Sequence, residues 1–215
     1  MTAMLPARAN PFRAGLIERL GYQLDDAGWK QLLARFAAQH MRGVLVGPHG
    51  SGKTTLREEL AWRLEQEGWR IRTLVPGAGR APTWAELRRF AAHADARTLL
   101  SIDGLDRIGA LGWWHLRRMA GSGPAILATS HVHGRLPTLH EHRTSPELLH
   151  DLVAALVPAS VSPGLRERCS GLFARHHGNV RACLRELYNE WAEHGAYRQP
   201  PDAATRAAHC TSRSA

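Results

Sequence analysis

The segment from residue 47 to residue 54 constrains this chain more than any other part of its sequence. It reads Gly47-Pro48-His49-Gly50-Ser51-Gly52-Lys53-Thr54 and fits the pattern G-x-x-x-x-G-K-[ST]. A short apolar run at 44–46 precedes it, and a helical pattern over 54–66 follows and ends at Gly68. A strand, a glycine-rich turn and a helix in this order predict an α/β fold whose turn binds phosphate.

The residue types of this loop suit a nucleoside triphosphate bound with Mg²⁺. Glycines allow successive backbone N–H groups to turn toward one phosphate, and the positive end of the following helix faces the same anion. Lys53 is expected to reach the β- and γ-phosphates, and the Thr54 hydroxyl to coordinate Mg²⁺. We therefore predict that residues 47–54, together with Thr55 in the first helical turn, bind the nucleotide.

A second, acidic ligand for Mg²⁺ is expected at the end of a neighbouring buried strand. The run Thr98-Leu99-Leu100-Ser101-Ile102-Asp103 ends in a carboxylate about fifty residues after the loop. An apolar run that ends in Asp is common, but its position about fifty residues after the loop favours a metal-binding role for this Asp. Asp103 is therefore the predicted partner of Thr54 at the metal.

Strand and helix patterns alternate along the first two thirds of the chain, which predicts a parallel sheet with crossover helices. After the strand at 44–46, strands are expected at 70–75, 97–103 and 124–130, and a weaker fifth at 138–143. Helices are expected at 24–40, at 84–94 after a Thr83 cap, and at 111–119.

From Ser145 onward the pattern is helical only. Helices are expected to open at Ser145-Pro146, at Ser162-Pro163 and at Asn179, the last running to about residue 194. We predict a P-loop α/β core with an amino-terminal arm over 1–144 and an all-α lid over 145–195. Residues 196–215 are rich in proline and small polar residues, which predicts a disordered tail.

Polar residues follow the fourth expected strand. Thr129 and Ser130 end the run Ala125-Ile126-Leu127-Ala128, and His131 comes next, at the sheet edge where ligands of open α/β folds bind. One of these side chains could touch the γ-phosphate or the attacking water. The alternative is that a hydroxyl only completes the hydrogen bonds of the strand end.

In the predicted lid, Gly178-Asn179-Val180-Arg181 begins the last helix. Arg181 then lies in the first turn, where it could register whether a γ-phosphate is present. The alternative is an arginine that faces solvent.

Together the segments GPHGSGKT, LLSIDGLD, ILATSH and GNVRACLRELY resemble the P-loop core and lid of AAA+ and STAND-type ATPases, over about residues 10–191. A group of uncharacterised bacterial ATP-binding proteins is similar in its DG-x-[ED] strand end and its Leu-Pro-Thr-Leu segment. The resemblance implies ATP as the nucleotide, a central P-loop strand, and adenine held between the arm and the lid. On that analogy Asn10-Pro11-Phe12 flanks the base, although Phe12 could equally anchor the core.

The sequence departs from that family pattern at Gly104. Most such ATPases carry an acidic residue there, directly after the metal-binding Asp, to orient or deprotonate water. The next acidic residue here is Asp106, which either takes that role or only caps the following helix. The candidate catalytic residues are thus Lys53, Asp103, Asp106 and Arg181, and no arginine finger stands out.

The formal net charge of +9 leaves DNA or RNA open as a partner, but 26 of the 28 basic residues are arginines scattered along the chain. Trp113 and Trp114 beside Arg117 and Arg118 could stack on bases, although core packing is the simpler interpretation. The sequence has three cysteines without a close pairing, no secretory signal and no apolar run long enough to span a membrane. These features predict a cytoplasmic protein that has no membrane among its partners.

The leading hypothesis is a Mg²⁺-dependent ATPase that couples nucleotide state to a macromolecular partner, either another protein or further copies of itself. A small-molecule or nucleoside kinase is an alternative, with residues 133–143 as a lid inserted between strands. A non-hydrolysing, nucleotide-dependent DNA-binding switch is the third, supported by the charge and by Gly104.

Overall fold

The computed structural model describes residues 10–22, 24–77, 80–157 and 164–194, and these fall into two units. One unit is Gly21–Arg143, and the other combines the described residues up to Leu20 with those from Thr144 onward. Among the described residues, no helix is long and apolar enough to cross a membrane.

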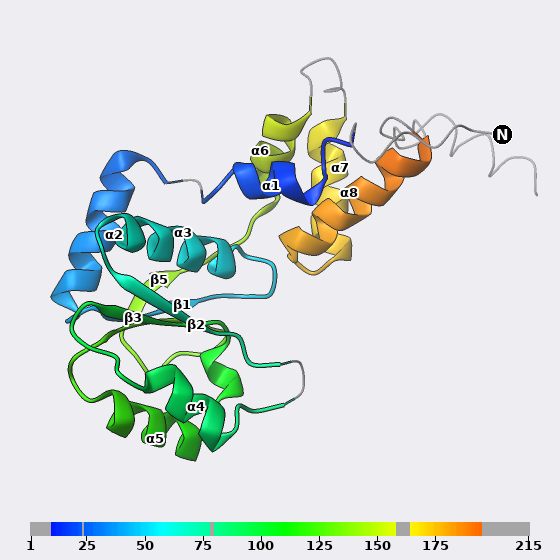
Figure 1. The fold of residues 1–215 in the computed structure, drawn as a ribbon. Helices are drawn as coiled ribbons and strands as arrows, with labels where there is room; N and C mark the ends of the chain where they lie inside the picture. The colour runs from blue at the N-terminus through cyan, green and yellow to red at the C-terminus, as the bar shows by residue number, and fades with distance from the viewer. Residues whose placement is uncertain (1–9, 23, 78–79, 158–163, 195–215) are drawn as a thin grey trace, which may run out of the picture. The chain divides into compact units, whose positions relative to one another are not determined.

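The unit Gly21–Arg143 is built on one five-stranded parallel sheet (Figure 1). Its strands are β1 (Arg42–Val46), β2 (Arg70–Leu74), β3 (Thr98–Ile102), β4 (Ala125–Ser130) and β5 (Thr138–Glu141), in the order β2-β3-β4-β1-β5. All five predicted strands are therefore present. The P-loop strand β1 is flanked on both sides, but it lies second from the edge and not at the centre that the family resemblance implied.

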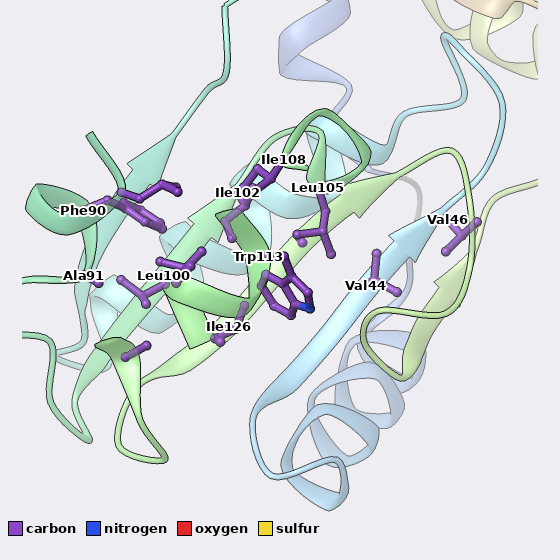
Figure 2. Close-up of a cluster of buried hydrophobic side chains, with 14 residues drawn as sticks. Val44, Val46, Phe90, Ala91, Leu100, Ile102, Leu105, Ile108, Trp113 and Ile126 are labelled. Carbon is purple, nitrogen blue, oxygen red and sulfur yellow. The ribbon is translucent and has the colours of Figure 1, made fainter. Parts of the chain in front are cut away.

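Helices cover both faces of this sheet (Figure 1). On one face α2 (Asp26–Ala38) and α3 (Lys53–Gln66) pack over a cluster that includes Trp29, Phe36 and Leu60. On the other face α4 (Trp84–Ala91) and α5 (Ala110–Ala120) close a second cluster, to which Trp113 and Ile126 belong (Figure 2). Strands β3 and β4 are buried along their whole length, as expected for strands covered on both faces.

Local signals explain where the helices begin. The Asp25 side chain accepts from the Gly28 N–H and caps α2, and Thr83 with Glu86 forms a capping box at the start of α4. The Thr83 cap predicted from the sequence is therefore confirmed. A short 3-10 helix, η2 (Leu105–Arg107), joins β3 to α5.

The second unit is helical, with α1 (Ala14–Arg19), α6 (Pro146–Leu156), α7 (Leu165–Arg175) and α8 (Val180–His194). Ser145 caps α6 by accepting from the Leu148 N–H, and the Asn179 side chain accepts from the Ala182 N–H at the start of α8. Both predicted caps are confirmed. The predicted start at Ser162-Pro163 and the predicted tail lie outside the described residues.

The amino-terminal segment packs with these helices. The sequence had grouped it with the α/β core over 1–144. Phe12 is buried in the helical cluster, where its ring meets Trp191 edge to face at 6.1 Å. The Asn10 amide donates to the Tyr188 carbonyl. Phe12 therefore anchors the helical core, which is the second of the two roles that the sequence left open. The other end of the sheet unit, at Arg143, falls one residue before the predicted boundary at 144.

Candidate functional site

The loop between β1 and α3 has the backbone that its glycines suggest. Gly50 and Gly52 have φ values of 71° and 88°, in the left-handed region that favours glycine. At Gly47 a Cβ atom would lie 2.7 Å from the Cβ of His142 and 2.9 Å from its carbonyl oxygen. Close packing against His142 therefore excludes any side chain at Gly47, while Pro48 and His49 are exposed at the tip of the loop.

The N-terminus of α3 opens into this loop without a side-chain cap, because its cap residue is Gly52. The N–H groups of a first helical turn, here those of Thr54 and Thr55, have no acceptor within their own helix. The buried Ser51 hydroxyl also has no hydrogen-bond partner among the described residues. Such a set of donors, with the positive end of a helix dipole behind it, is suited to hold an anion.

Lys53 is buried at the same end of α3, and its ammonium donates to the carbonyls of Gly47 at 2.8 Å and Pro48 at 2.6 Å. These bonds hold the charged end of Lys53 against the loop. The positive charge is thus placed where a phosphate in the loop would meet it.

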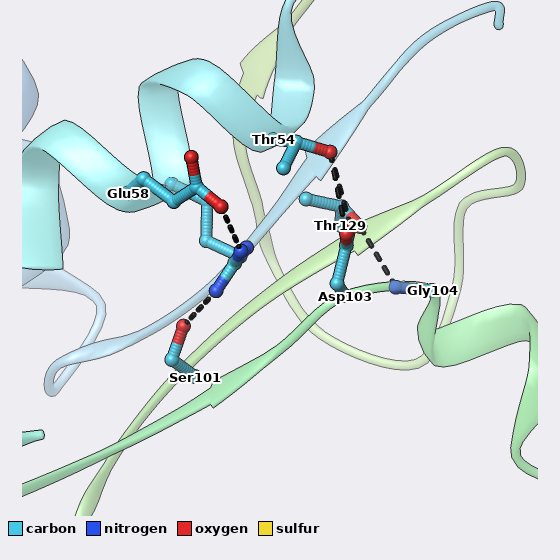
Figure 3. Close-up of polar contacts among 7 residues, drawn as sticks. Thr54, Glu58, Ser101, Asp103, Gly104 and Thr129 are labelled. Carbon is cyan, nitrogen blue, oxygen red and sulfur yellow. Dashed lines mark hydrogen bonds and ion pairs between the residues drawn. The ribbon is translucent and has the colours of Figure 1, made fainter. Parts of the chain in front are cut away.

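Thr54 faces Asp103 at the carboxyl edge of the sheet (Figure 3). Its hydroxyl oxygen lies 3.2 Å and 3.4 Å from the two carboxylate oxygens of Asp103. Asp103 directly follows β3, so the two predicted metal ligands, 49 residues apart, meet at one point. Both offer the hard oxygen atoms that Mg²⁺ prefers.

Thr129 holds that carboxylate from the other side (Figure 3). Its hydroxyl donates to Asp103 at 2.7 Å and accepts from the Gly104 N–H at 2.8 Å. The Thr129 hydroxyl is therefore engaged within the protein, which is the simpler of the two roles that the sequence left open. Contact between Thr129 and a nucleotide stays a prediction.

Asp106 and His131 form a second pair at this edge. The Asp106 carboxylate accepts from the His131 backbone N–H at 3.3 Å, while the helix that follows, α5, has Gly109 at its N-cap. Asp106 therefore does not cap α5, and its place near the loop is compatible with a role in orienting water.

The His131 ring packs on the loop itself. Its Nδ1 lies 3.1 Å from the Gly47 carbonyl, and because a carbonyl only accepts, Nδ1 carries a proton. Its ring centroid is 3.8 Å from that of His49. Burial, with the nearby positive charge of Lys53 and the neighbouring His49, lowers the pKa of His131, so the ring is neutral near pH 7.

Two of the predicted site residues have less support. The Ser130 hydroxyl donates to the Val132 carbonyl at 2.7 Å and accepts from its N–H at 3.1 Å, which commits it to a turn. Arg181 is exposed in the first turn of α8, in the helical unit. The nucleotide contacts of Ser130 and Arg181 remain predictions.

A cluster of three residues behind the loop, namely Tyr22, His140 and His142, was not predicted from the sequence. His142 is buried, its Nδ1 donates to the Ser51 carbonyl at 3.0 Å, and burial lowers its pKa to about 4. The Tyr22 hydroxyl lies 3.0 Å from Nε2 of His140, and His140 and His142 have ring centroids 4.8 Å apart. Tyr22 and His140 are 118 residues apart in the chain, so only the folded sheet brings them together.

A buried arginine next to the site was also missed. Arg57, one turn after Thr54 in α3, donates to the Ser101 hydroxyl at 2.6 Å and to the Glu58 carboxylate at 2.9 Å (Figure 3). The position of Ser101 inside an apolar strand was the only sequence signal for such a partner. The bond ties α3 to β3, the two elements that carry Thr54 and Asp103.

Comparison with solved structures identifies the fold. The Holliday junction branch migration motor RuvB of Thermotoga maritima is similar over 93% of this chain and 73% of that chain, with a TM-score of 0.55 and 16% identity. A variant of the same RuvB is similar over the same shares, with a TM-score of 0.54 and 17% identity. No family model matches the sequence, and the comparison with curated proteins gives no significant match.

The chain therefore has the AAA+ P-loop fold, a five-stranded parallel sheet between helices with a C-terminal helical segment. This confirms the fold class and the AAA+-like architecture expected from the sequence. At this identity the likeness extends to the fold alone.

Proposed function

We propose that this protein binds Mg·ATP at residues 47–55 and hydrolyses it. The observation that carries the proposal is the meeting of Thr54 with Asp103, 3.2 Å apart, beside the uncapped N-terminus of α3. A phosphate-binding loop alone is common to many activities. A hydroxyl and a carboxylate converging next to it are the protein ligands of a nucleotide-bound magnesium ion.

The residues present fit Mg²⁺ well. The Thr54 hydroxyl and the Asp103 carboxylate would hold the ion, and Thr129 fixes the carboxylate that it needs. Bound there, Mg²⁺ neutralises charge on the phosphates and favours transfer of the terminal one. An ion held by few protein groups agrees with the tendency of Mg²⁺ to keep several of its waters.

The chain itself supplies the remaining tasks. The N–H groups at the start of α3 and the Ser51 hydroxyl donate hydrogen bonds to phosphate oxygens, and Lys53 supplies positive charge. Asp106, held near the loop by the His131 N–H, orients the attacking water or accepts its proton. Gly104 leaves no acidic side chain directly after Asp103, so Asp106 is the candidate for that step.

The AAA+ fold suggests what the hydrolysis is for. RuvB, with the same fold, is a branch migration motor for Holliday junctions. By analogy, the present chain couples its nucleotide state to a macromolecular partner or to further copies of itself. For Arg181, a role in sensing the γ-phosphate rests on the sequence pattern Gly178-Asn179-Val180-Arg181 alone. ATP as the preferred nucleotide rests on the resemblance of the sequence to AAA+ and STAND-type ATPases.

The kinase alternative required an inserted lid, and the structure has a strand of the sheet in that segment. Residues 133–143 were to form a lid inserted between strands, but Thr138–Glu141 is β5, which pairs in parallel with β1. A non-hydrolysing switch remains as the competing function.

Phosphate release from Mg·ATP by the purified chain tests the proposal. We expect release by the wild type, loss in Lys53→Ala, and normal release in Lys30→Ala, a matched change at the other lysine, which is exposed on α2. Tight ATP binding without release in the wild type would contradict hydrolysis and favour the switch.

A further inference from the structure

The exposed face of α4 and α5 is unusual in its composition. Trp114 is 60% exposed, Leu111 is 73% exposed, and Trp84 is 53% exposed. Large apolar side chains that gather in this way on one surface are typical of an interaction site. The Trp–Arg face, as we name it, consists of Trp84, Arg88, Leu111, Trp114, Arg117 and Arg118.

The helical period explains how this face forms. Trp113 (Figure 2) and Leu116 belong to the buried cluster under the sheet. Leu111, Trp114 and Arg118 follow the i, i+3, i+7 spacing along the opposite side of α5. The two tryptophans that adjoin in the sequence therefore have different roles. Trp113 packs the core, and Trp114 is left in solvent.

Contacts join the two helices into one surface. The Trp84 ring meets His115 edge to face, with 4.2 Å between ring centroids, and the Arg118 guanidinium lies 5.9 Å from the Trp114 ring centroid. Arg88 lies one turn along α4 from Trp84. Two indole rings are thus presented from neighbouring helices with guanidinium groups beside them.

The charge of this face has one sign. Arg88, Arg117 and Arg118 are exposed, and no ion pair engages them among the described residues. Glu86 is the acidic residue of α4, and Arg80 pairs with it at 2.7 Å. A ligand that covers the indoles must therefore bring negative charge.

We propose that the Trp–Arg face binds single-stranded DNA. Unpaired bases offer flat faces on which Trp84 and Trp114 can stack, and the negatively charged phosphates can pair with Arg88, Arg117 and Arg118. An acidic peptide would use the arginines but leave the indoles without stacking partners, and duplex DNA hides its base faces. The inference names the partner that the proposed function leaves open, but it concerns a surface apart from the nucleotide site.

Fluorescence anisotropy with a labelled 15-nucleotide oligothymidine, without any nucleotide, tests this proposal. We expect salt-sensitive binding by the wild type, with a slope of log K against log salt of about −2 for three neutralised phosphates. Trp114→Ala should weaken binding by about fivefold or more, as loss of a stacking partner does. Trp62→Ala is the matched control, since Trp62 is 56% exposed on α3, over the opposite face of the sheet (Figure 1).

Arg118→Gln gives a second readout, because it should make the salt slope shallower by about 0.7 while Lys30→Gln leaves it unchanged. The proposal would be overturned if the wild type does not bind the oligothymidine, or if Trp114→Ala and Trp62→Ala have equal effects. Tighter binding of duplex DNA would also overturn it. So would polyglutamate binding that depends on Trp114, or an oligouridine bound more than tenfold tighter. Because ATP is absent throughout, failure here leaves the hydrolase proposal untouched, and failure of phosphate release leaves this one untouched.

Discussion

Thr129 and Asp103 are joined by a hydrogen bond of 2.7 Å across the ends of β4 and β3. The same hydroxyl accepts from the Gly104 N–H at 2.8 Å. One buried side chain therefore fixes both the carboxylate proposed to hold Mg²⁺ and the turn that follows it.

Replacement of Thr129 by valine removes this hydroxyl but keeps the shape of the side chain. The Gly104 N–H would lose its acceptor, so we expect the free energy of unfolding to fall by about 1–3 kcal/mol. Phosphate release should also slow, because Asp103 is no longer held. Urea unfolding and a phosphate assay measure the two effects, and Thr129→Ser, which keeps the hydroxyl, should restore most of both. An unchanged Thr129→Val protein would remove Thr129 from the site.

Gly104 has a φ of 93°, where side chains other than glycine are strained. A Cβ there would also lie 3.1 Å from Cδ of Arg107. We therefore expect Gly104→Ala to lower the free energy of unfolding by about 1–3 kcal/mol. Gly123→Ala is the control, since its Cβ would meet nothing closer than 3.7 Å. Equal losses in the two variants would show that the left-handed backbone at Gly104 has no special role.

Asp106→Asn tests the water-orienting role of this residue. Asparagine keeps an oxygen that can accept from the His131 N–H but removes the negative charge. We expect phosphate release to fall by about 100-fold, as for loss of a general base, with little change in thermal stability. Asp26→Asn, an exposed change in the first turn of α2, should leave release unchanged. Full activity of Asp106→Asn would assign the step to another group.

His142 should make the protein less stable in mild acid. Its folded pKa of about 4 lies below the ordinary value of 6.5, so the unfolded chain binds more protons between these values. Stability therefore falls as pH decreases through this window, by about 2 kcal/mol from pH 7.5 to 5 for this group. The lowered pKa values of His131 and His140 act in the same direction.

Urea unfolding at several pH values measures this dependence. His142→Gln should flatten it, whereas the exposed His133→Gln should not. A wild-type stability that is constant between pH 7.5 and 5 would contradict the buried, neutral state of His142.

Much of the fold could be predicted because local signals agreed with the tertiary structure. The loop at 47–54 set a strand before it and a helix after it, and the side chains of Thr83, Ser145 and Asn179 marked helix starts by mechanisms that act within three residues. Helix α1 was missed because its six residues carry too little periodic pattern.

The site was predictable in part for the same reason. Thr54 and Asp103 follow from the rule that parallel strands present their carboxyl ends at one edge. The contacts of His131 with Gly47, and of Tyr22 with His140, join segments 84 and 118 residues apart. No spacing in the sequence signals such pairs, since only the register of β1, β4 and β5 creates them.

The central claim is that Thr54 and Asp103 hold one Mg²⁺ for a nucleotide in the adjacent loop. Calorimetric titration of ATP into the protein, with Mg²⁺ or with a chelator, tests it most directly. We predict that Mg²⁺ tightens ATP binding to the wild type by tenfold or more, and that Thr54→Val and Asp103→Asn each lose this gain while still binding metal-free ATP. Equal Mg²⁺ dependence in the wild type and both variants would contradict the assignment.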